Sequence, residues 1–257
     1  MQRIVAEQKM PLSQEPAPSR LDVWRMFDRI SSRYDLLNHL LSFGQDFLWR
    51  RKLAAIVSQS ERPELLDLAT GTGDLLLTVA RGNPSMRLGI GLDMAGAMLE
   101  LGQRKLAASG HQIHLSLIRA DALRLPFCKA SFDIVTIAFG IRNVENVQSA
   151  LAEMYRVLRP SGKVLIMEFS LPSNRLLRFA HIRYLRWAVP VIGRLVSGDA
   201  QAYRYLNKTI ESFPYGDRFC KLIEEAGFEQ VRQRLLTFDA VTIYEAVRPD
   251  DAGNPKK

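Results

Sequence analysis

The chain has 257 residues, 47% of them hydrophobic, and a formal net charge of +8. A chain of this length buries roughly three quarters of its unfolded surface. Its two cysteines and four histidines match no ligand spacing, so we expect neither a disulfide framework nor a metal site. Because no apolar run approaches the roughly 20 residues that span a bilayer, and residues 1–20 lack the apolar core of a secretory signal, we expect a cytoplasmic protein.

The two ends of the chain are expected to enclose a single domain. Residues 1–20 are polar, with prolines at positions 11, 16 and 18, and predict a disordered lead-in. Residues 249–257 predict a flexible tail. The domain itself is expected over residues 21–248.

Residues 22–57 predict two helices joined by a connector. Their apolar faces have helical spacing, with Val23, Met26, Phe27 and Ile30 in the first and Trp49, Leu53, Ile56 and Val57 in the second. Two aromatic side chains, a glycine and several polar groups between residues 34 and 44 favour a lid or entrance segment. The alternative is a plain N-terminal helical cap, residues 21–60, packed on the domain.

From residue 64 onward, strand and helix patterns alternate. The predicted strands cover residues 64–69, 88–92, 113–118, 132–139, 163–169, 228–235 and 240–247. The predicted helices cover residues 74–81, 96–108, 147–158 and 216–226. This alternation predicts an α/β fold with a doubly wound, mostly parallel sheet. The link at residues 237–239 is too short for a parallel crossover, so the last two strands should pair antiparallel, which argues against a dehydrogenase-type domain.

The first predicted strand runs into a glycine turn, LDLATGTGD, that ends at Asp74. Gly71 and Gly73 let the backbone approach a ligand closely, and the following helix offers free N–H groups. The third position of a dinucleotide fingerprint is Leu76, and no P-loop lysine is present. Asp74 would repel a pyrophosphate but suits a cationic group, such as the amino group of a methionine moiety. The alternative is a tight turn without a ligand.

Two further acids follow the next two strands. Asp93 lies at the end of the second strand, where a carboxylate can accept both ribose hydroxyls of an adenosine. It can also cap the next helix, and the two roles can coexist. Asp121 follows the third strand and can accept from an adenine amine, although it can equally be a turn aspartate. The carboxyl ends of parallel strands meet at one edge, so these groups predict a single ligand site there.

Several longer stretches carry a pattern specific to one family. They are Met26-Phe27, Arg33-Tyr34-Asp35, Asn38, Ser42-Phe43-Gly44, Trp49-Arg50, LDLATGTGD, Phe139-Gly140-Ile141-Arg142-Asn143-Val144, Tyr155 to Gly162, Glu168-Phe169-Ser170 and Ala202 to Leu206. Over residues 23–246 the chain thereby resembles the ubiquinone/menaquinone biosynthesis C-methyltransferase family. Two departures are Thr70, where members often have glycine, and Ala138, where some have serine.

The resemblance implies a class I S-adenosylmethionine-dependent methyltransferase fold, Rossmann-like, with a mostly parallel seven-stranded sheet and an antiparallel last strand. It implies S-adenosyl-L-methionine as cofactor, with contacts at Thr72, Asp93, Asp121 and Ala122. Together with the turn residues, the cofactor-binding candidates are Asp67, Gly71, Thr72, Gly73, Asp74, Asp93, Met94, Asp121, Ala122 and Ala138. The implied product is a methylated menaquinone, a methylated ubiquinone, or both.

Methylation of a hydroquinone carbon needs an electron-rich ring, which phenol ionisation supplies. Arg142 is the candidate that stabilises the phenolate, but it cannot be the base because it keeps its proton. Asn143 can orient a phenol or a water. Weaker candidates, for proton handling, are Tyr34, Asp35, Tyr203 and His39. The alternative for Arg142 is a structural ion pair with Glu145 or another acid.

The basic charge is concentrated in an amphipathic insertion, residues 171–212. Between positions 171 and 208 seven basic residues face one acid, Asp199, so this stretch alone carries +6. The implied substrate is a polyprenylated quinol, and Leu176–Val196 interleaves apolar residues with arginines. We therefore expect it to contact an anionic membrane surface, with Tyr184 and Trp187 at headgroup depth, or to line a groove for the tail. The alternative is a helix packed on the core with extended arginines.

Two other classes of protein compete with this reading. An RNA methyltransferase would explain the charge, but no RNA-binding module is visible, and we expect no nucleic-acid partner. A non-enzymatic binding module is opposed by the intact glycine turn, Asp93 and Asp121. The sequence favours demethylmenaquinol as the substrate but leaves 2-polyprenyl-6-methoxy-1,4-benzoquinol open. A homodimer also stays open.

Overall fold

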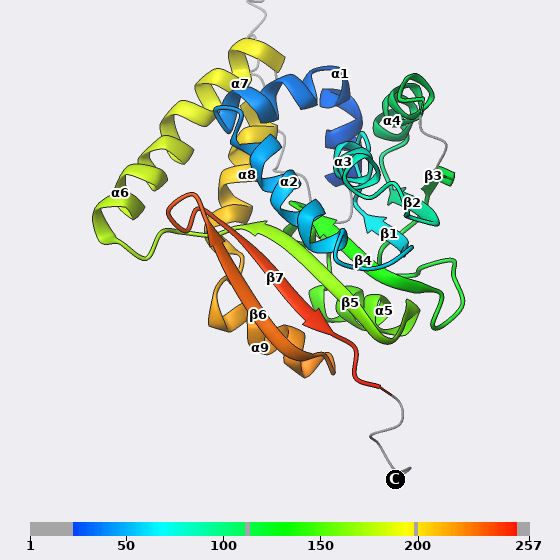
Figure 1. Ribbon diagram of the computed structural model, residues 1–257. Coiled ribbons are helices and arrows are strands. Elements are labelled where there is room, and N and C mark those ends of the chain that lie inside the picture. The colour runs from blue at the N-terminus through cyan, green and yellow to red at the C-terminus, as the bar shows by residue number, and fades with distance from the viewer. Residues whose placement is uncertain (1–22, 111–113, 198–199, 251–257) are drawn as a thin grey trace, which may run out of the picture.

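The computed structural model describes residues 23–110, 114–197 and 200–250. The predicted lead-in, residues 1–20, and most of the predicted tail lie outside the described residues. The described chain forms one twisted sheet with helices on both faces and a group of further helices above one edge, as Figure 1 shows.

The sheet has seven strands in the order β3-β2-β1-β4-β5-β7-β6. These are β1 Glu64–Leu68, β2 Leu88–Asp93, β3 His114–Arg119, β4 Phe132–Ala138, β5 Leu158–Phe169, β6 Glu229–Leu236 and β7 Val241–Val247. β7 is inserted between β5 and β6 and is antiparallel to both, whereas the other pairs are parallel. The predicted fold class, including the antiparallel last strand, is therefore confirmed.

Helices cover the two faces of the sheet because the buried strands alternate their side chains. α5 Val147–Val157 and α9 Asp217–Glu225 pack on one face, against Leu66, Val135 and Ile166. α2 Gln45–Val57 and α3 Asp74–Gly82 pack on the other, against the neighbouring residues Leu65, Ile134 and Leu165. The sequence of a strand covered on both faces is a continuous apolar run, so the sequence alone predicts these strands.

β5 corrects one predicted boundary. It begins at Leu158, directly after α5, and includes the Arg159-Pro160-Ser161-Gly162 stretch that predicts a turn. The amide of Ser161 donates to the Arg248 carbonyl at 3.0 Å, and the Arg248 amide donates to Gly162 at 2.9 Å. These backbone bonds hold the stretch against the end of β7, a long-range pairing that local turn chemistry does not reveal.

The N-terminal cap corrects a second boundary. α1 spans Val23–Leu41 and α2 spans Gln45–Val57, so the connector is only residues 42–44 and not the longer segment predicted from position 34. The helix continues because Leu37 extends its apolar face and is buried at 1% exposure. The turn itself uses left-handed backbone at Phe43 and Gly44.

The basic insertion folds as a helical layer above the carboxyl edge of the sheet (Figure 1). It comprises α6 Arg175–Arg183, a π-helical turn η2 Tyr184–Ala188, α7 Val189–Ser197 and α8 Ala200–Ser212. Leu185, Val189 and Tyr203 from this layer form a third apolar cluster with Met26 and Ile30 of α1. No helix within the described residues is long and apolar enough to cross a membrane.

Candidate active site

The glycine turn between β1 and α3 is built on left-handed backbone. Ala69, Gly71 and Gly73 have φ values of 47°, 56° and 78°. Beneath the turn, the buried Asp67 accepts from Thr70 Oγ1 at 2.6 Å and from Thr136 Oγ1 at 2.7 Å. Burial raises the pKa of Asp67 to about 6, and the two hydroxyl donors oppose that rise. Asp67 therefore ties the turn to β4 from below.

Asp93 holds the same turn from the side of β2. Its Oδ2 accepts from the Gly71 amide and its Oδ1 from the Ala95 amide, both at 2.8 Å. The predicted capping role is not borne out, because the N-cap of α4, Gly96–Ala108, is Ala95 and α4 has no side-chain capping bond; Asp93 accepts only from the amide of the N-cap residue itself. Burial raises the pKa of Asp93, while the backbone donors Ala95 and Gly71 lower it. The carboxylate lines a cavity, where it can still meet a ligand.

That cavity, of about 170 Å³, lies at the carboxyl ends of β2, β3 and β4. The cofactor candidates that line it are Gly71, Asp93, Met94, Asp121, Ala122 and Ala138. Asp121 also accepts from the Leu123 amide at 2.9 Å, so its turn role is real as well. Carboxylates on one side and methionine, leucine and alanine side chains on the other suit a nucleoside, which has ribose hydroxyls and a flat, weakly polar base. The residues present therefore fit an adenosine group.

Not every candidate faces this cavity. Gly73 lines neither this cavity nor the larger one described below, and a Cβ there would meet Leu106 of α4 at 3.4 Å, so this glycine serves the turn and the helix packing. Thr72, Asp74 and Asp67 line a second, larger cavity on the other side of the turn.

Lys105 is the residue that sequence reasoning missed. Lys105 lies in the last turn of α4. Its Nζ lies 2.6 Å from both Asp35 Oδ2 and Asp74 Oδ1 and donates to Thr72 Oγ1 at 2.8 Å. Thr72 in turn donates to Asp35 at 2.7 Å. Three predicted site residues, Asp35, Thr72 and Asp74, therefore contact the same lysine ammonium group. No motif marks Lys105, since only the folded chain brings it to the turn.

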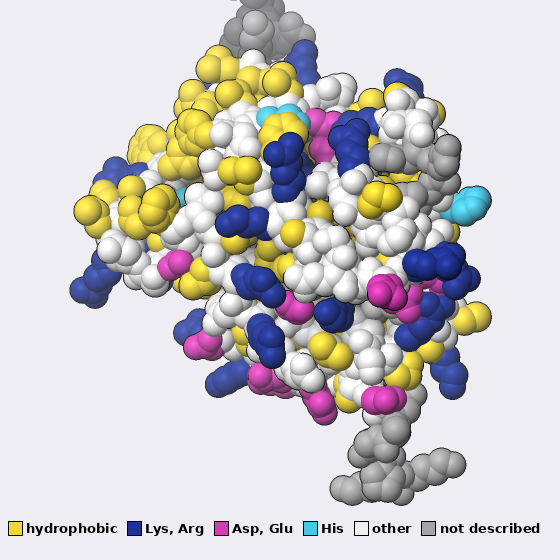
Figure 2. Space-filling model, viewed as in Figure 1, with side chains coloured by type: hydrophobic (Ala, Val, Ile, Leu, Met, Phe, Trp, Pro, Cys, Tyr) yellow, Lys and Arg dark blue, Asp and Glu magenta, His cyan; other side chains and the backbone are white. Residues whose placement is uncertain are grey.

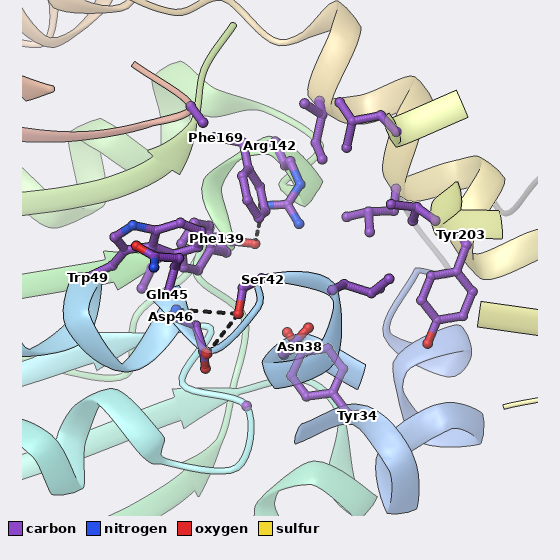
Figure 3. A pocket seen from close by; sticks show the side chains of 18 of the residues that line it. Tyr34, Asn38, Ser42, Gln45, Asp46, Trp49, Phe139, Arg142, Phe169 and Tyr203 are labelled. Carbon is purple, nitrogen blue, oxygen red and sulfur yellow. Dashed lines mark hydrogen bonds between the residues drawn. The ribbon is translucent and has the colours of Figure 1, made fainter. Parts of the chain in front are cut away.

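The larger cavity has a volume of about 460 Å³ and an aromatic inner wall. Trp49, Phe139 and Phe169 pack together with ring centroids 4.5 to 6.2 Å apart (Figure 3). The Arg142 guanidinium lies 5.2 Å from the centroid of the Phe169 ring. A flat aromatic substrate can stack on such a wall.

Arg142 is buried at 4% exposure, on the short 3-10 helix η1, Ile141–Asn143. Its Nη1 donates to Glu168 Oε1 and to the Phe139 carbonyl, both at 2.6 Å. The ion pair weighed in the sequence analysis is thus present, with Glu168 as its acid and not Glu145. Burial raises the pKa of Glu168, and the Arg142 charge opposes that rise. The buried Nε of Arg142 has no hydrogen-bond partner within the described part of the chain, so a donor is left for a ligand.

The other catalytic candidates are placed differently from one another. Tyr34 and Asn143 line both cavities, and Tyr203 lines the larger one. Burial raises the pKa of Tyr34, so its hydroxyl keeps its proton at neutral pH. Asp35 lines the larger cavity, with its carboxylate held by Thr72 and Lys105. His39 lines neither cavity, but its Nδ1 lies 2.6 Å from Oδ2 of Asp46, which lines the larger one.

Comparison with known proteins identifies the group to which this site belongs. The model of the ubiE/COQ5 methyltransferase family matches residues 14–248. The chain belongs to this family. A demethylmenaquinone methyltransferase of Thermus thermophilus is 42% identical over 224 residues, covering 87% of this chain and 100% of the relative. A ubiquinone/menaquinone biosynthesis C-methyltransferase of Geobacter sulfurreducens is 42% identical over 219 residues, covering 85% of each.

Solved structures agree on the fold. A methyltransferase from Thermotoga maritima, described as S-adenosylmethionine-dependent and a possible histamine N-methyltransferase, has a TM-score of 0.60 at 16% identity, covering 88% of this chain and 99% of that one. An S-adenosylmethionine-dependent methyltransferase from Aquifex aeolicus has a TM-score of 0.58 at 14% identity, covering 77% and 89%. At such identities the likeness concerns the fold alone. Family membership makes the chain an S-adenosylmethionine-dependent methyltransferase.

Proposed function

We propose that this protein methylates a ring carbon of a polyprenylated quinol and converts demethylmenaquinol to menaquinol. The observation that carries the proposal is that two cavities of different chemistry share one wall. Tyr34, Gly71, Ala138, Phe139 and Asn143 line both the nucleoside cavity and the aromatic cavity. A methyl donor in one and an acceptor in the other would meet where the two cavities join along these residues, because transfer needs the reacting atoms about 3–3.5 Å apart with nothing between them.

The residues on the two sides of that wall are proposed to have different roles, one set binding the cofactor and the other the quinol. Asp93, Asp121 and the glycine turn would hold S-adenosylmethionine, which supplies an activated methyl group. On the other side, the aromatic wall would stack on the quinol ring and exclude water. Arg142, with its free Nε donor, would stabilise the ring oxygen as a phenolate. This raises electron density at the neighbouring carbon, which is the nucleophile.

Two polar side chains complete the proposed site. The Asn143 amide can orient the second ring oxygen, and the protonated Tyr34 can donate to the first. Asp35 is proposed to position Thr72, since its carboxylate is already paired with Lys105. After the methyl group has been transferred, the ring carbon gives up its proton to a water that Asn143 can orient.

The substrate's polyprenyl tail gives a reason for membrane contact. The basic segment Leu176–Val196 is proposed to rest on an anionic membrane surface, peripherally and from the cytoplasmic side. It contributes Leu177, Ala180, His181 and Tyr184 to the lining of the aromatic cavity. This placement suits both roles expected for it, as tail groove and as lipid contact.

The experiment that tests the proposal uses labelled S-adenosylmethionine with two reduced short-tailed acceptors, a demethylmenaquinol and a 6-methoxy-1,4-benzoquinol. Label in the first product alone supports a menaquinone enzyme, and label in both supports an enzyme that also serves ubiquinone synthesis. No label in either, with cofactor binding intact, refutes the substrate assignment.

A further inference from the structure

Three segments far apart in the sequence surround the mouth of the aromatic cavity. A side chain that both lines a cavity and is exposed marks its opening, and three large hydrophobic side chains do so. Phe43, in the corner between α1 and α2, is 78% exposed; Phe238, in the hairpin between β6 and β7, is 77% exposed; and Leu177, on α6, is 41% exposed. The mouth therefore opens between the corner, the hairpin and α6.

Side-chain bonds brace these three segments against one another. Trp49 Nε1 of α2 donates to Thr237 of the hairpin at 2.8 Å. Ser170 Oγ, just before α6, donates to the carbonyl of Asp239 of the hairpin at 2.6 Å. Tyr184 of η2 donates from its hydroxyl to the Leu41 carbonyl, next to the corner, at 2.7 Å. The rim of the mouth is thus a closed ring and not three independent loops.

The hairpin is held in a costly conformation. Thr237, Phe238 and Asp239 all have positive φ, at 47°, 54° and 68°. Each such residue costs about 1–3 kcal/mol when it is not glycine. The result is a phenylalanine presented to solvent, which contributes little to the core and suggests a role at the surface.

The outer surface of the ring is unusually apolar. Within the described residues, every large exposed hydrophobic side chain except Met94 lies on the ring or on the helices and the strand β6 that extend it; they are Leu36, Leu40, Phe43, Phe47, Leu48, Leu176, Leu177, Phe179, Trp187, Val191, Leu195, Leu235 and Phe238. Figure 2 shows such side chains gathered over α6 and α7, with more above α1. Single exposed hydrophobics are ordinary, but a concentration of this kind marks an interaction surface.

The charge of the same surface indicates the partner. Residues 175–197 contain five arginines and no acidic residue. Of these, Arg186 is paired with Glu211, and Arg183 lies over the Phe179 ring. Arginines beside protruding aromatic and aliphatic side chains match an anionic bilayer, which offers phosphate groups above hydrocarbon.

We propose that this braced ring, here called the docking ring, rests on an anionic lipid bilayer and turns the cavity mouth toward the hydrocarbon. The inference rests on the proposed function, because it is the tail of a lipid-borne quinol that would enter without leaving the membrane. It goes beyond the basic segment, since it makes the α1–α2 corner and the β6–β7 hairpin part of the lipid contact.

Two double variants test the ring away from the cavity lining. Leu36→Ser with Leu40→Ser alters the outer face of α1, and Phe179→Ser with Trp187→Ser alters α6 and η2; none of the four lines the cavity. Full-length protein is sedimented with phosphatidylcholine vesicles, with and without phosphatidylglycerol. Each double variant should weaken binding to the anionic vesicles by at least about tenfold, because two apolar side chains no longer enter the lipid. Cys128→Ser, an exposed change before β4 at the opposite edge of the sheet, is the control and should bind normally.

The outcomes separate this inference from the proposed function. Methylation of a soluble short-tailed quinol should stay near normal in both double variants, whereas methylation of a long-tailed quinol in vesicles should fall with binding. Normal vesicle binding by the Leu36/Leu40 variant would remove the corner from the surface and overturn the ring. Equal binding to neutral vesicles, or a dimer without lipid that these variants dissociate, would overturn the anionic bilayer as its occupant. Failure to methylate any quinol would instead refute the proposed function.

Discussion

The Arg142–Glu168 pair offers the sharpest test of the proposed chemistry. Arg142→Met would remove the phenolate-stabilising donor, but it would also leave the Glu168 carboxylate, 1% exposed, without its cation. Breaking a buried pair in this way costs about 3–5 kcal/mol of stability. A loss of activity in the single variant would therefore have two explanations.

The double variant Arg142→Met with Glu168→Gln separates the two explanations. It removes both charges together, so most of the stability lost in the single variant should return, since neutral replacements of buried pairs are often tolerated. If Arg142 acts only as a structural cation, activity returns as well. If its guanidinium stabilises the ring oxygen, kcat stays lower by about 10²–10³-fold, the effect of one oxyanion donor.

The assay measures kcat with a reduced short-tailed quinol, alongside thermal unfolding of each variant. Arg234→Gln with Glu245→Gln is the matched control, because it neutralises an arginine–glutamate pair on the surface of β6 and β7 at 3.1 Å. A double variant whose kcat lies within about threefold of the wild-type value, where an oxyanion donor should cost far more, would refute the role given to Arg142.

Three further predictions concern the walls of the site. Lys105→Met should weaken binding of S-adenosylhomocysteine by about tenfold, because Thr72 and Asp35 lose a charged hydrogen-bond partner. Calorimetry should show unchanged affinity for 5′-methylthioadenosine, which lacks the amino-acid part. An equal loss of affinity for the two ligands would contradict the prediction. The folded-state pKa of Asp67 is raised to about 6 from 3.8, so the stability that its protonated form contributes is full below the unfolded pKa and is lost as pH rises through about 6. Relative to the Asp67→Asn variant, the wild type should therefore lose about 1 kcal/mol of stability, or about 2–4 °C in Tm, between pH 5 and pH 8. Parallel Tm profiles of the two proteins over this pH range would contradict the prediction. Gly140→Ala should destabilise by about 1–3 kcal/mol in denaturant titrations, because its Cβ would lie 2.5 Å from that of Ala69, whereas Gly82→Ala, with 3.9 Å of clearance, should not.

The strands could be predicted from the sequence because a strand buried on both faces of the sheet has apolar residues at consecutive positions. The same holds for the glycine turn and for Asp93, since a turn, a strand end and a helix start are local events. The antiparallel pairing of the last two strands followed from the length of the link between them. The position of β7 between β5 and β6, by contrast, depends on which edge of the sheet is free to pair with it, and no local sequence pattern indicates that.

The partners of the site residues could not be predicted in the same way. Glu168 and Lys105 reach Arg142 and Asp74 from 26 and 31 residues away in the chain. Each is a single charged residue in an ordinary strand or helix, and its role arises only from packing. The mouth of the cavity is a clearer case still, because its three segments come from positions near 43, 177 and 238 and acquire a common function only by lying together.

The wall shared by the two cavities explains where the fold accepts strain. Ala69 and Phe139 follow the two central strands, β1 and β4, and both adopt positive φ, at 47° and 56°. Such residues each cost about 1–3 kcal/mol, and neither is a glycine that would adopt the conformation freely. Gly140 follows at once, with no room for a Cβ against Ala69. The chain is thus turned sharply at both strand ends, where Ala69, Ala138 and Phe139 line both the nucleoside cavity and the aromatic cavity. A methyl transfer needs the reacting atoms about 3–3.5 Å apart with nothing between them, so the proposed site requires the two cavities to join beside these turns.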